Sequence, residues 1–153
     1  MRSVSHIVFF AGLLCATQSI CAQLQVTSPV INEVHYDEVD KTEVAEFIEI
    51  YNPTDAAISL EGWEISGGVD FLFPPASRIE GGSYLIIAQD PATIARKFRR
   101  SGALGPWSGR LRNSGETLNL RDPDGVVVST VDYQLGFPWP TVGDLVDGVS
   151  PSI

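Results

Sequence analysis

Acidic side chains crowd the first half of this 153-residue chain, and they suggest a site for a hard cation. Between Glu33 and Asp70 the sequence has eleven acidic residues and one lysine. Calcium is bound in proteins by roughly six to eight oxygen atoms, which a flexible loop with several carboxylates can supply. The candidate ligands share the polar segment 37–43 and are Asp37, Glu38, Asp40 and Glu43. The alternative is a solvated acidic loop that holds no metal.

A second acidic motif, Asp122-Pro123-Asp124-Gly125, resembles the start of an EF-hand calcium loop. It lacks the third acidic position and the distal glutamate that such a loop needs. Proline at the second position and glycine at the fourth are typical of a type I turn. We therefore expect a turn between two strands here rather than a metal site.

Residues for nucleophilic or acid–base catalysis are scarce. His35 is the only histidine after residue 22, no cysteine follows Cys21, and no serine lies in a Gly-x-Ser-x-Gly motif. Carboxylate pairs are easy to find in so acidic a chain, and none stands out as a glycosidase pair would. We expect His35 to lie in a strand at a sheet surface. The protein is predicted to be non-catalytic, with calcium as its one candidate cofactor.

Basic residues are concentrated later in the chain, whose net charge is −9. Six of the nine lysines and arginines after residue 22 fall between 96 and 112. The acidic excess argues against a dedicated DNA- or membrane-binding protein, but a local contact with DNA, a heparin-like glycan or another polyanion remains open. The candidate residues are Arg96, Lys97, Arg99, Arg100, Arg110 and Arg112. A solvated helix face is the alternative.

Three tryptophans are candidates for stacking on a sugar ring, namely Trp63, Trp107 and Trp139. Each is adjacent to a glycine or a proline, as expected for a ring that packs at a corner of the core. We therefore favour a packing role for all three.

The first 22 residues resemble a secretory signal peptide. Arg2 supplies a positive charge, and Ile7–Ala16 is an apolar run of ten residues. A membrane-spanning helix needs about 20 apolar residues, so the run is too short to be an anchor. We expect cleavage after Ala22, a short lead at 23–28, and a secreted, periplasmic or cell-surface protein without a transmembrane segment.

Short apolar runs between turn residues predict about eight strands. The clearest are 29–36, 45–52, 83–88, 117–121 and 126–133. In the first, Ile31 and Val34 should point inward; in the second, Ile48 and Ile50 share one face with Glu46, and Phe47 and Tyr51 share the other with Glu49. Segments 44–51 and 84–88 are predicted to be core strands without a functional role. The Gly81-Gly82 pair predicts a tight hairpin between residues 77–80 and 83–88.

One helix is predicted, over about residues 91–100. Asp90 is a suitable N-cap, and Pro91 occupies the first helical position, where its missing N–H does no harm. Ile94 and Phe98 lie one turn apart and should dock so short a helix on the sheet. Gly102 is expected to end it. Many short strands with one small helix predict an antiparallel β-sandwich.

The order of these segments resembles the lamin tail domain, an immunoglobulin-like sandwich that also occurs in secreted bacterial proteins. The resemblance covers about residues 29–143 and implies an all-β, antiparallel fold with one short helix. The matching stretches are VINEVHY at 30–36, EFIEIYNPTD at 46–55, ISLEGWEIS at 58–66, FLFPP at 71–75, GSYLIIAQDP at 82–91, LGPWSGRLRNSGETLNLRDPDGVVVSTVDY at 104–133 and WP at 139–140.

Bacterial members of the family usually close with an apolar strand after an acidic-glycine turn. This chain ends GDLVDGVSPSI and has no such strand after Gly148. We therefore expect residues 144–153 to be an atypical C-terminus, either truncated or closing the sandwich in an unusual way.

The resemblance implies an interaction role. We expect an exported, non-catalytic binding or adhesion module that contacts another protein or an extracellular polymer. Two alternatives stay open: an accessory fragment of a secreted hydrolase or nuclease, and a calcium-dependent carbohydrate-binding module. A nuclear-lamina role is not implied, because the chain has no heptad rod.

Overall fold

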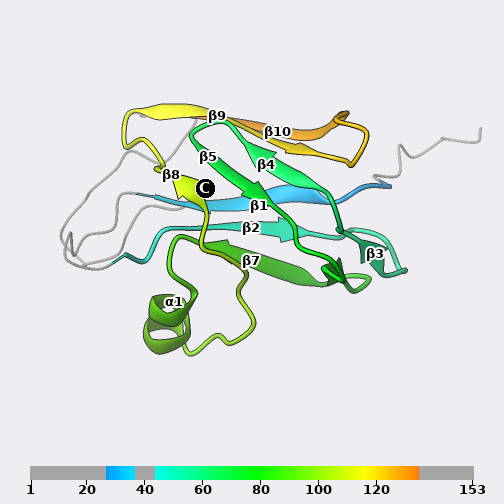
Figure 1. The fold of residues 1–153 in the computed structure, drawn as a ribbon, viewed down its shortest axis with the longest axis horizontal. Helices are drawn as coiled ribbons and strands as arrows, with labels where there is room; N and C mark the ends of the chain where they lie inside the picture. Colours follow the sequence, from blue (N-terminus) through cyan, green and yellow to red (C-terminus); the bar gives the residue numbers. More distant parts are fainter. Residues whose placement is uncertain (1–26, 37–43, 135–153) are drawn as a thin grey trace, which may run out of the picture.

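A computed structural model describes residues 27–36 and 44–134, and this part of the chain is almost wholly β-structure (Figure 1). It contains ten strands and one short helix. They are β1 (Val30–His35), β2 (Phe47–Tyr51), β3 (Ile58–Ser59), β4 (Glu64–Ser66), β5 (Val69–Leu72), β6 (Arg78–Ile79), β7 (Tyr84–Ala88), α1 (Pro91–Phe98), β8 (Ser108–Gly109), β9 (Gly115–Arg121) and β10 (Val127–Gln134).

The strands form two principal antiparallel sheets and one small ladder. One sheet has the order β1-β2-β7, the other the order β10-β9-β4-β5-β8, and β3 pairs with β6. In Figure 1 the helix α1 lies beyond β7, outside the two sheets. The fold is therefore the predicted all-β, antiparallel sandwich with a single short helix.

The core lies between the two sheets because apolar side chains alternate along each strand. From the three-stranded sheet, Ile31 and Val34 are buried, as the sequence predicts, and so are Ile48 and Ile50, which share one face of β2. From the five-stranded sheet, the side chains that meet them are Ile65, Phe71, Leu118 and Leu120. All eight belong to one apolar cluster. Along β2 and β9 the inward residues follow a period of two, whereas Ile31 and Val34 are three residues apart because the register of β1 shifts between Ile31 and Glu33.

The predicted Gly81-Gly82 hairpin is wrong. Strand β6 pairs with β3 and strand β7 pairs with β2, so the segments on either side of the two glycines belong to different sheets. The turn is hydrogen-bonded instead to the segment that follows β2, because Gly82 N–H donates to the carbonyls of Asn52 and Thr54 at 3.0 and 2.9 Å. Turn residues in a sequence predict that the chain changes direction, but they do not determine which strands pair with each other.

The helix starts as predicted and ends earlier than predicted. Asp90 caps it, accepting hydrogen bonds from Ala92 N–H at 3.0 Å and Thr93 Oγ1 at 2.7 Å. Its last residue is Phe98, because Arg99 turns into the left-handed conformation with φ 54° and ψ 35°. Gly102 therefore does not end the helix, since the chain has already left it three residues earlier.

Candidate functional site

Helix α1 covers one end of the outer face of the β1-β2-β7 sheet, where Phe98 contacts His35 and Phe47. Under it, the His35 ring stacks on Phe47 with centroids 4.7 Å apart, and Phe98 packs edge-on to both rings. Ile94 completes this contact and is fully buried. His35 is consequently only 6% exposed, and the expectation of a surface histidine is wrong, because the helix that covers it comes from more than fifty residues later in the chain.

The other end of this face is not covered by the helix and is partly exposed. Residues in alternating positions point to the same side of a strand, so the outward set of β2 and β7 continues beyond the helix. Glu33 of β1 lies opposite Glu49 of β2 in the same register. We call this region the tyrosine face, and its residues are Glu33, Glu49, Tyr51, Tyr84 and Ile86.

The centre of the tyrosine face is a stacked aromatic pair. Tyr51 and Tyr84 face each other across the β2–β7 ladder, with ring centroids 4.6 Å apart and ring planes inclined by 27°. Tyr84 is nevertheless 57% exposed. Tyr51 covers one side of the Tyr84 ring, so we take this exposure to come from the ring's free side and edge. An ordered aromatic ring in solvent is a frequent feature of contact surfaces.

From the sequence we expect residues 84–88 to be a core strand without a functional role. The expected burial is wrong for Tyr84, which is exposed. The signal that could have found it is the alternation along β7, in which Tyr84 shares parity with Ile86 and not with the core residue Ile87. A tyrosine at an outward position near a strand end has little to bury it.

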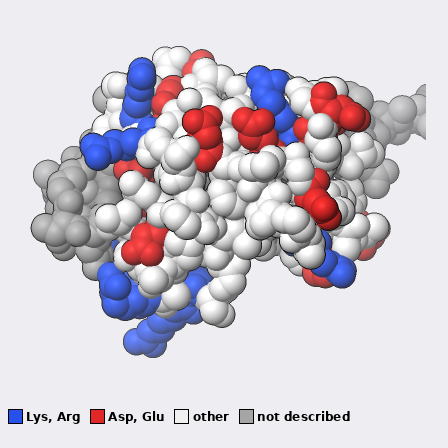
Figure 2. Space-filling model, viewed as in Figure 1, with Lys and Arg blue, Asp and Glu red and all other residues white. Residues whose placement is uncertain are grey.

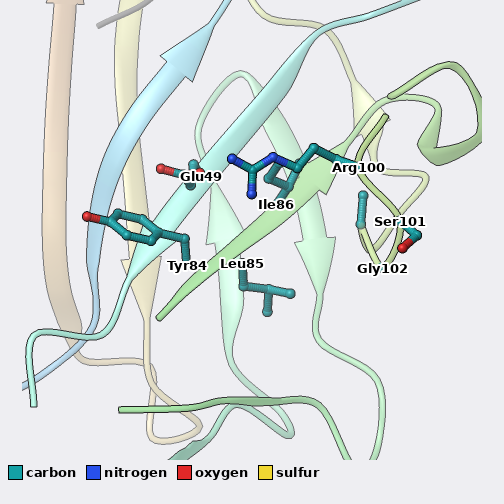
Figure 3. Close-up of a pocket in the computed structure, with 8 residues that line it drawn as sticks. Glu49, Tyr84, Leu85, Ile86, Arg100, Ser101 and Gly102 are labelled. Carbon is teal, nitrogen blue, oxygen red and sulfur yellow. The ribbon is translucent and has the colours of Figure 1, made fainter. Parts of the chain in front are cut away.

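A small pocket adjoins the tyrosine face, with a volume of about 90 Å³ (Figure 3). One wall is made by side chains of β2 and β7, and the other by the chain that follows α1. Figure 3 shows the guanidinium of Arg100 extending toward Glu49, while Leu85 points to the other side of its strand. The lining residues are Glu49, Tyr84, Leu85, Ile86, Arg100, Ser101, Gly102 and Ala103.

The pocket exists because a parallel pairing beside β7 stops short. Leu104 N–H donates to Ile86 C=O, and Ala88 N–H donates to Leu104 C=O, both at 2.9 Å. Gly102, with φ +91°, takes the preceding chain away from the strand. Backbone groups two residues apart point the same way along a strand, so Ile86 N–H and Tyr84 C=O are directed toward this gap instead of toward β2.

The carboxylate of Glu49 is the most perturbed ionisable group of the site. Burial raises the pKa of the Glu49 carboxyl, and the charge of Glu33 raises it further. Asn32 Nδ2 donates to Glu49 Oε1 at 3.0 Å and lowers this pKa, as does the charge of Arg100, but the net direction is upward. Two like charges directly opposite in a ladder are unfavourable, and together they make this part of the face repel anions.

The structure places the six candidate polyanion residues in two groups. Arg96, Lys97, Arg99 and Arg100 lie at the C-terminal end of α1, and residues 110 and 112 lie between β8 and β9. Figure 2 shows basic side chains where α1 lies and, well separated, near the β8–β9 connection. Arg112 is also engaged, because its Nε lies 3.8 Å from the Glu116 carboxylate. On the face that Figure 2 shows, the two groups are separate.

The proposed calcium ligands Asp37, Glu38, Asp40 and Glu43 lie outside the described residues. Within residues 27–36 and 44–134, no group of three or more acidic, histidine or cysteine side chains could hold a metal ion.

The Asp122 motif forms the predicted turn. Asp122 Oδ1 accepts hydrogen bonds from the N–H groups of Asp124 and Val126 at 3.0 and 2.9 Å, and Gly125 N–H donates to Asp122 C=O at 2.9 Å. The carboxylate is therefore occupied in stabilising the β9–β10 connection.

The tryptophans that are described pack as expected. Trp107 is 7% exposed and belongs to the core, and Trp63 is partly buried against it. Trp139 lies outside the described residues. In the described part of the chain, no helix has the length and apolar character to cross a membrane.

A second hollow, of about 410 Å³, lies along β3 and β6. Its lining is small or aliphatic apart from Arg78, which pairs with Glu80 at 2.6 Å. It has neither an aromatic ring nor a carboxylate in its lining, so it is the weaker candidate.

Comparison with known proteins gives one family. No curated protein is similar enough to this chain to count as a match. The family model of the Lamin Tail Domain matches residues 23–134, which is well over half of the chain and includes every described strand. The chain therefore belongs to the lamin tail domain family, whose domains are non-catalytic, immunoglobulin-like binding modules.

Proposed function

We propose that this protein is exported and acts as a non-catalytic binding or adhesion module that contacts another protein or an extracellular polymer. The contact surface is the tyrosine face together with the adjoining pocket. The observation that carries this proposal is the exposed, stacked Tyr51–Tyr84 pair beside a pocket that contains Glu49 and Arg100.

An aromatic pair with charged neighbours is suited to holding a partner. Aromatic rings and arginine contribute most of the affinity in many interfaces, because they bury a large area and still form polar contacts. The pairing of Tyr51 with Tyr84 also fixes the ring before a partner arrives, which lowers the entropy lost on binding.

The position of His35 supports a non-catalytic role. Its ring is enclosed by Phe47 and Phe98 and does not line the pocket. A general base must lie within hydrogen-bond reach of the proton that it removes, so His35 would be unable to serve a substrate bound on the tyrosine face.

A site-specific photo-crosslinker tests the contact surface. Benzoylphenylalanine is introduced at Tyr84, and at Val127 on the other sheet as a control of similar exposure. After illumination with extracellular material from the source cells, we expect adducts at position 84 that excess unlabelled protein suppresses. Equal adducts at both positions, or none at position 84, would contradict the proposed surface.

Export is tested with a reporter enzyme that becomes active only outside the cytoplasm. Fused to residues 1–30, it should be active, and Leu13→Arg should abolish the activity by interrupting the apolar run. Activity that survives Leu13→Arg would contradict export by this segment.

A second candidate function is a polyanion contact at the end of α1. It is favoured by the four exposed basic residues among positions 96–100, where Figure 2 shows basic side chains projecting from the molecule. Arg96→Glu combined with Arg99→Glu should abolish retention on immobilised heparin at low salt, while Arg110→Glu should change it little. Full retention by the double variant would remove this candidate.

A further inference from the structure

We infer that the tyrosine face binds a saccharide: the apolar side of a pyranose ring stacks on Tyr84, and one ring substituent enters the pocket between β7 and residues 100–103. This inference rests on the proposed function and names the chemical class of the polymer. It is carried by the geometry of the aromatic pair and by the mixture of polar groups around it.

The ring surface is the first requirement. Tyr51 holds one side of the Tyr84 ring at a centroid distance of 4.6 Å, and 57% of Tyr84 is still accessible. The C–H groups on one side of a pyranose are apolar and match the electron-rich face of an aromatic ring. A ring that is already ordered in the free protein loses little conformational freedom when it makes such a contact.

The polar groups of the pocket are the second requirement, because they include both donors and acceptors. Ile86 N–H and the guanidinium of Arg100 donate, whereas Tyr84 C=O and the Glu49 carboxylate accept. A sugar hydroxyl both donates and accepts, so adjacent hydroxyls can satisfy both kinds of group. A phosphate or carboxylate would use the donors and be repelled by Glu49, and an aliphatic side chain would offer no hydrogen bond to any of the four groups.

The size of the pocket limits what enters it. A volume of about 90 Å³ accommodates a hydroxymethyl or acetamido substituent but not a whole sugar ring. The ring would therefore remain above the pocket, at the level of Tyr84, which is where stacking requires it. The two contacts belong to one ligand because Tyr84 itself lines the pocket.

The charge of the face narrows the class of saccharide. Glu33 and Glu49 face each other beside the pocket, and the chain as a whole carries a net charge of −9. The two carboxylates would repel sulfated glycans and polyuronates from this face. The ligand is therefore a neutral or N-acetylated hexose polymer, for which cellohexaose and chitohexaose are suitable soluble probes.

The test is an amide NMR titration of the ¹⁵N-labelled protein with each probe up to about 5 mM, a range suited to weak, millimolar binding. We expect shifts confined to Glu49, Tyr84, Ile86 and residues 101–103 with at least one probe. Tyr84→Ala should weaken binding by about tenfold or more, whereas Tyr84→Phe keeps the ring and should keep most of the affinity. Val127→Ala, on the other sheet, should change nothing.

Three results would overturn the inference: no shifts with either probe, shifts located elsewhere, or unchanged affinity in Tyr84→Ala. The crosslinking experiment separates these failures from failure of the proposed function. If adducts form at position 84 but neither sugar shifts any amide signal, the face binds a partner and that partner is not a saccharide. Silence in both experiments would remove the binding face as well.

Discussion

Replacing Asn52 should show that one buried amide joins two turns of this fold. Asn52 follows β2 and is fully buried. Its Nδ2 donates to the carbonyls of Ala56 at 2.8 Å, Glu80 at 3.1 Å and Ile79 at 3.3 Å, and its Oδ1 accepts from Thr54 N–H at 3.0 Å and Thr54 Oγ1 at 2.8 Å. The side chain therefore connects the turn after β2 with the turn before β7.

The cost of Asn52→Ala follows from the number of groups that lose a partner. The carbonyls of Ala56 and Glu80 and the N–H of Thr54 each lose a good hydrogen bond, worth about 1 kcal/mol net. The cavity and the longer contact to Ile79 add to this, so we expect a loss of about 3–4 kcal/mol in the free energy of unfolding. A domain with a stability of about 5–15 kcal/mol remains folded after such a loss.

The isosteric change Asn52→Asp separates hydrogen bonding from packing. A carboxylate would face three carbonyl oxygens in place of the amide donors, so near neutral pH the loss should be about 4 kcal/mol. These neighbours raise the pKa of the introduced carboxyl in the folded state. The deficit is therefore complete above the raised folded pKa and shrinks as the pH falls through it, because the folded state takes up the proton first.

The assay is urea unfolding at about pH 5 and about pH 8, each variant compared with the parent protein at the same pH. Asn119→Ala is the matched control, since the Asn119 amide makes an exposed hydrogen bond to Thr130 at 3.0 Å and should contribute less than about 0.5 kcal/mol. An Asn52→Ala loss below about 1 kcal/mol would refute the reasoning. So would an Asn52→Asp deficit that is equal at both pH values.

Two further predictions concern other parts of the chain. Tyr133→Phe removes a hydroxyl that donates toward Arg112 C=O at 3.0 Å and the Glu116 carboxylate at 2.9 Å, so it should lower the free energy of unfolding by about 1–2 kcal/mol in denaturant titrations. Burial and Glu116 raise the pKa of Tyr133, so stability should decrease as the pH rises above about 10, where the unfolded tyrosine ionises, and this decrease should be smaller in Tyr133→Phe. If residues 37–43 bind calcium, millimolar calcium should raise the melting temperature of the protein and not that of Asp40→Asn; an unchanged melting temperature in the parent protein would contradict the site.

The parts of the fold that follow from local chemistry could be predicted from the sequence. The two faces of β2 follow from alternation, the β9–β10 turn from Asp122-Pro123-Asp124-Gly125, and the start of α1 from Asp90 and Pro91. Each depends on contacts within a few residues, so the sequence pattern and the structure contain the same information.

The parts that depend on distant segments could not be predicted in this way. The burial of His35 depends on Phe98, and the partner of β7 is β2 and not β6. The helix ends where Arg99 enters the left-handed region, a position that favours glycine in other helices. Local patterns contain no term for these tertiary contacts.

In the candidate site, too, some features follow from the local sequence and others depend on distant segments. Tyr51 and Tyr84 are more than thirty residues apart in the sequence, and only the β2–β7 register places them opposite each other. The outward parity of Tyr84 is visible in the sequence, but its partner and the pocket beside it are not. The six basic residues show the opposite case: they are close in the sequence but lie in two groups, at the end of α1 and between β8 and β9.

The chain between β7 and Leu104 leaves the sandwich and returns to it at the same strand. It departs where Gln89 N–H bonds to Glu46 C=O, and it comes back where Leu104 pairs with Ile86 and Ala88. Ile94 and Phe98 fix α1 on the sheet, but the stretch 99–103 is exchangeable, because its length and composition can change without altering the register of any strand. Since it supplies one wall of the pocket, exchanging it between related domains would give different ligand preferences on an unchanged framework, and it is the natural segment to randomise in a library.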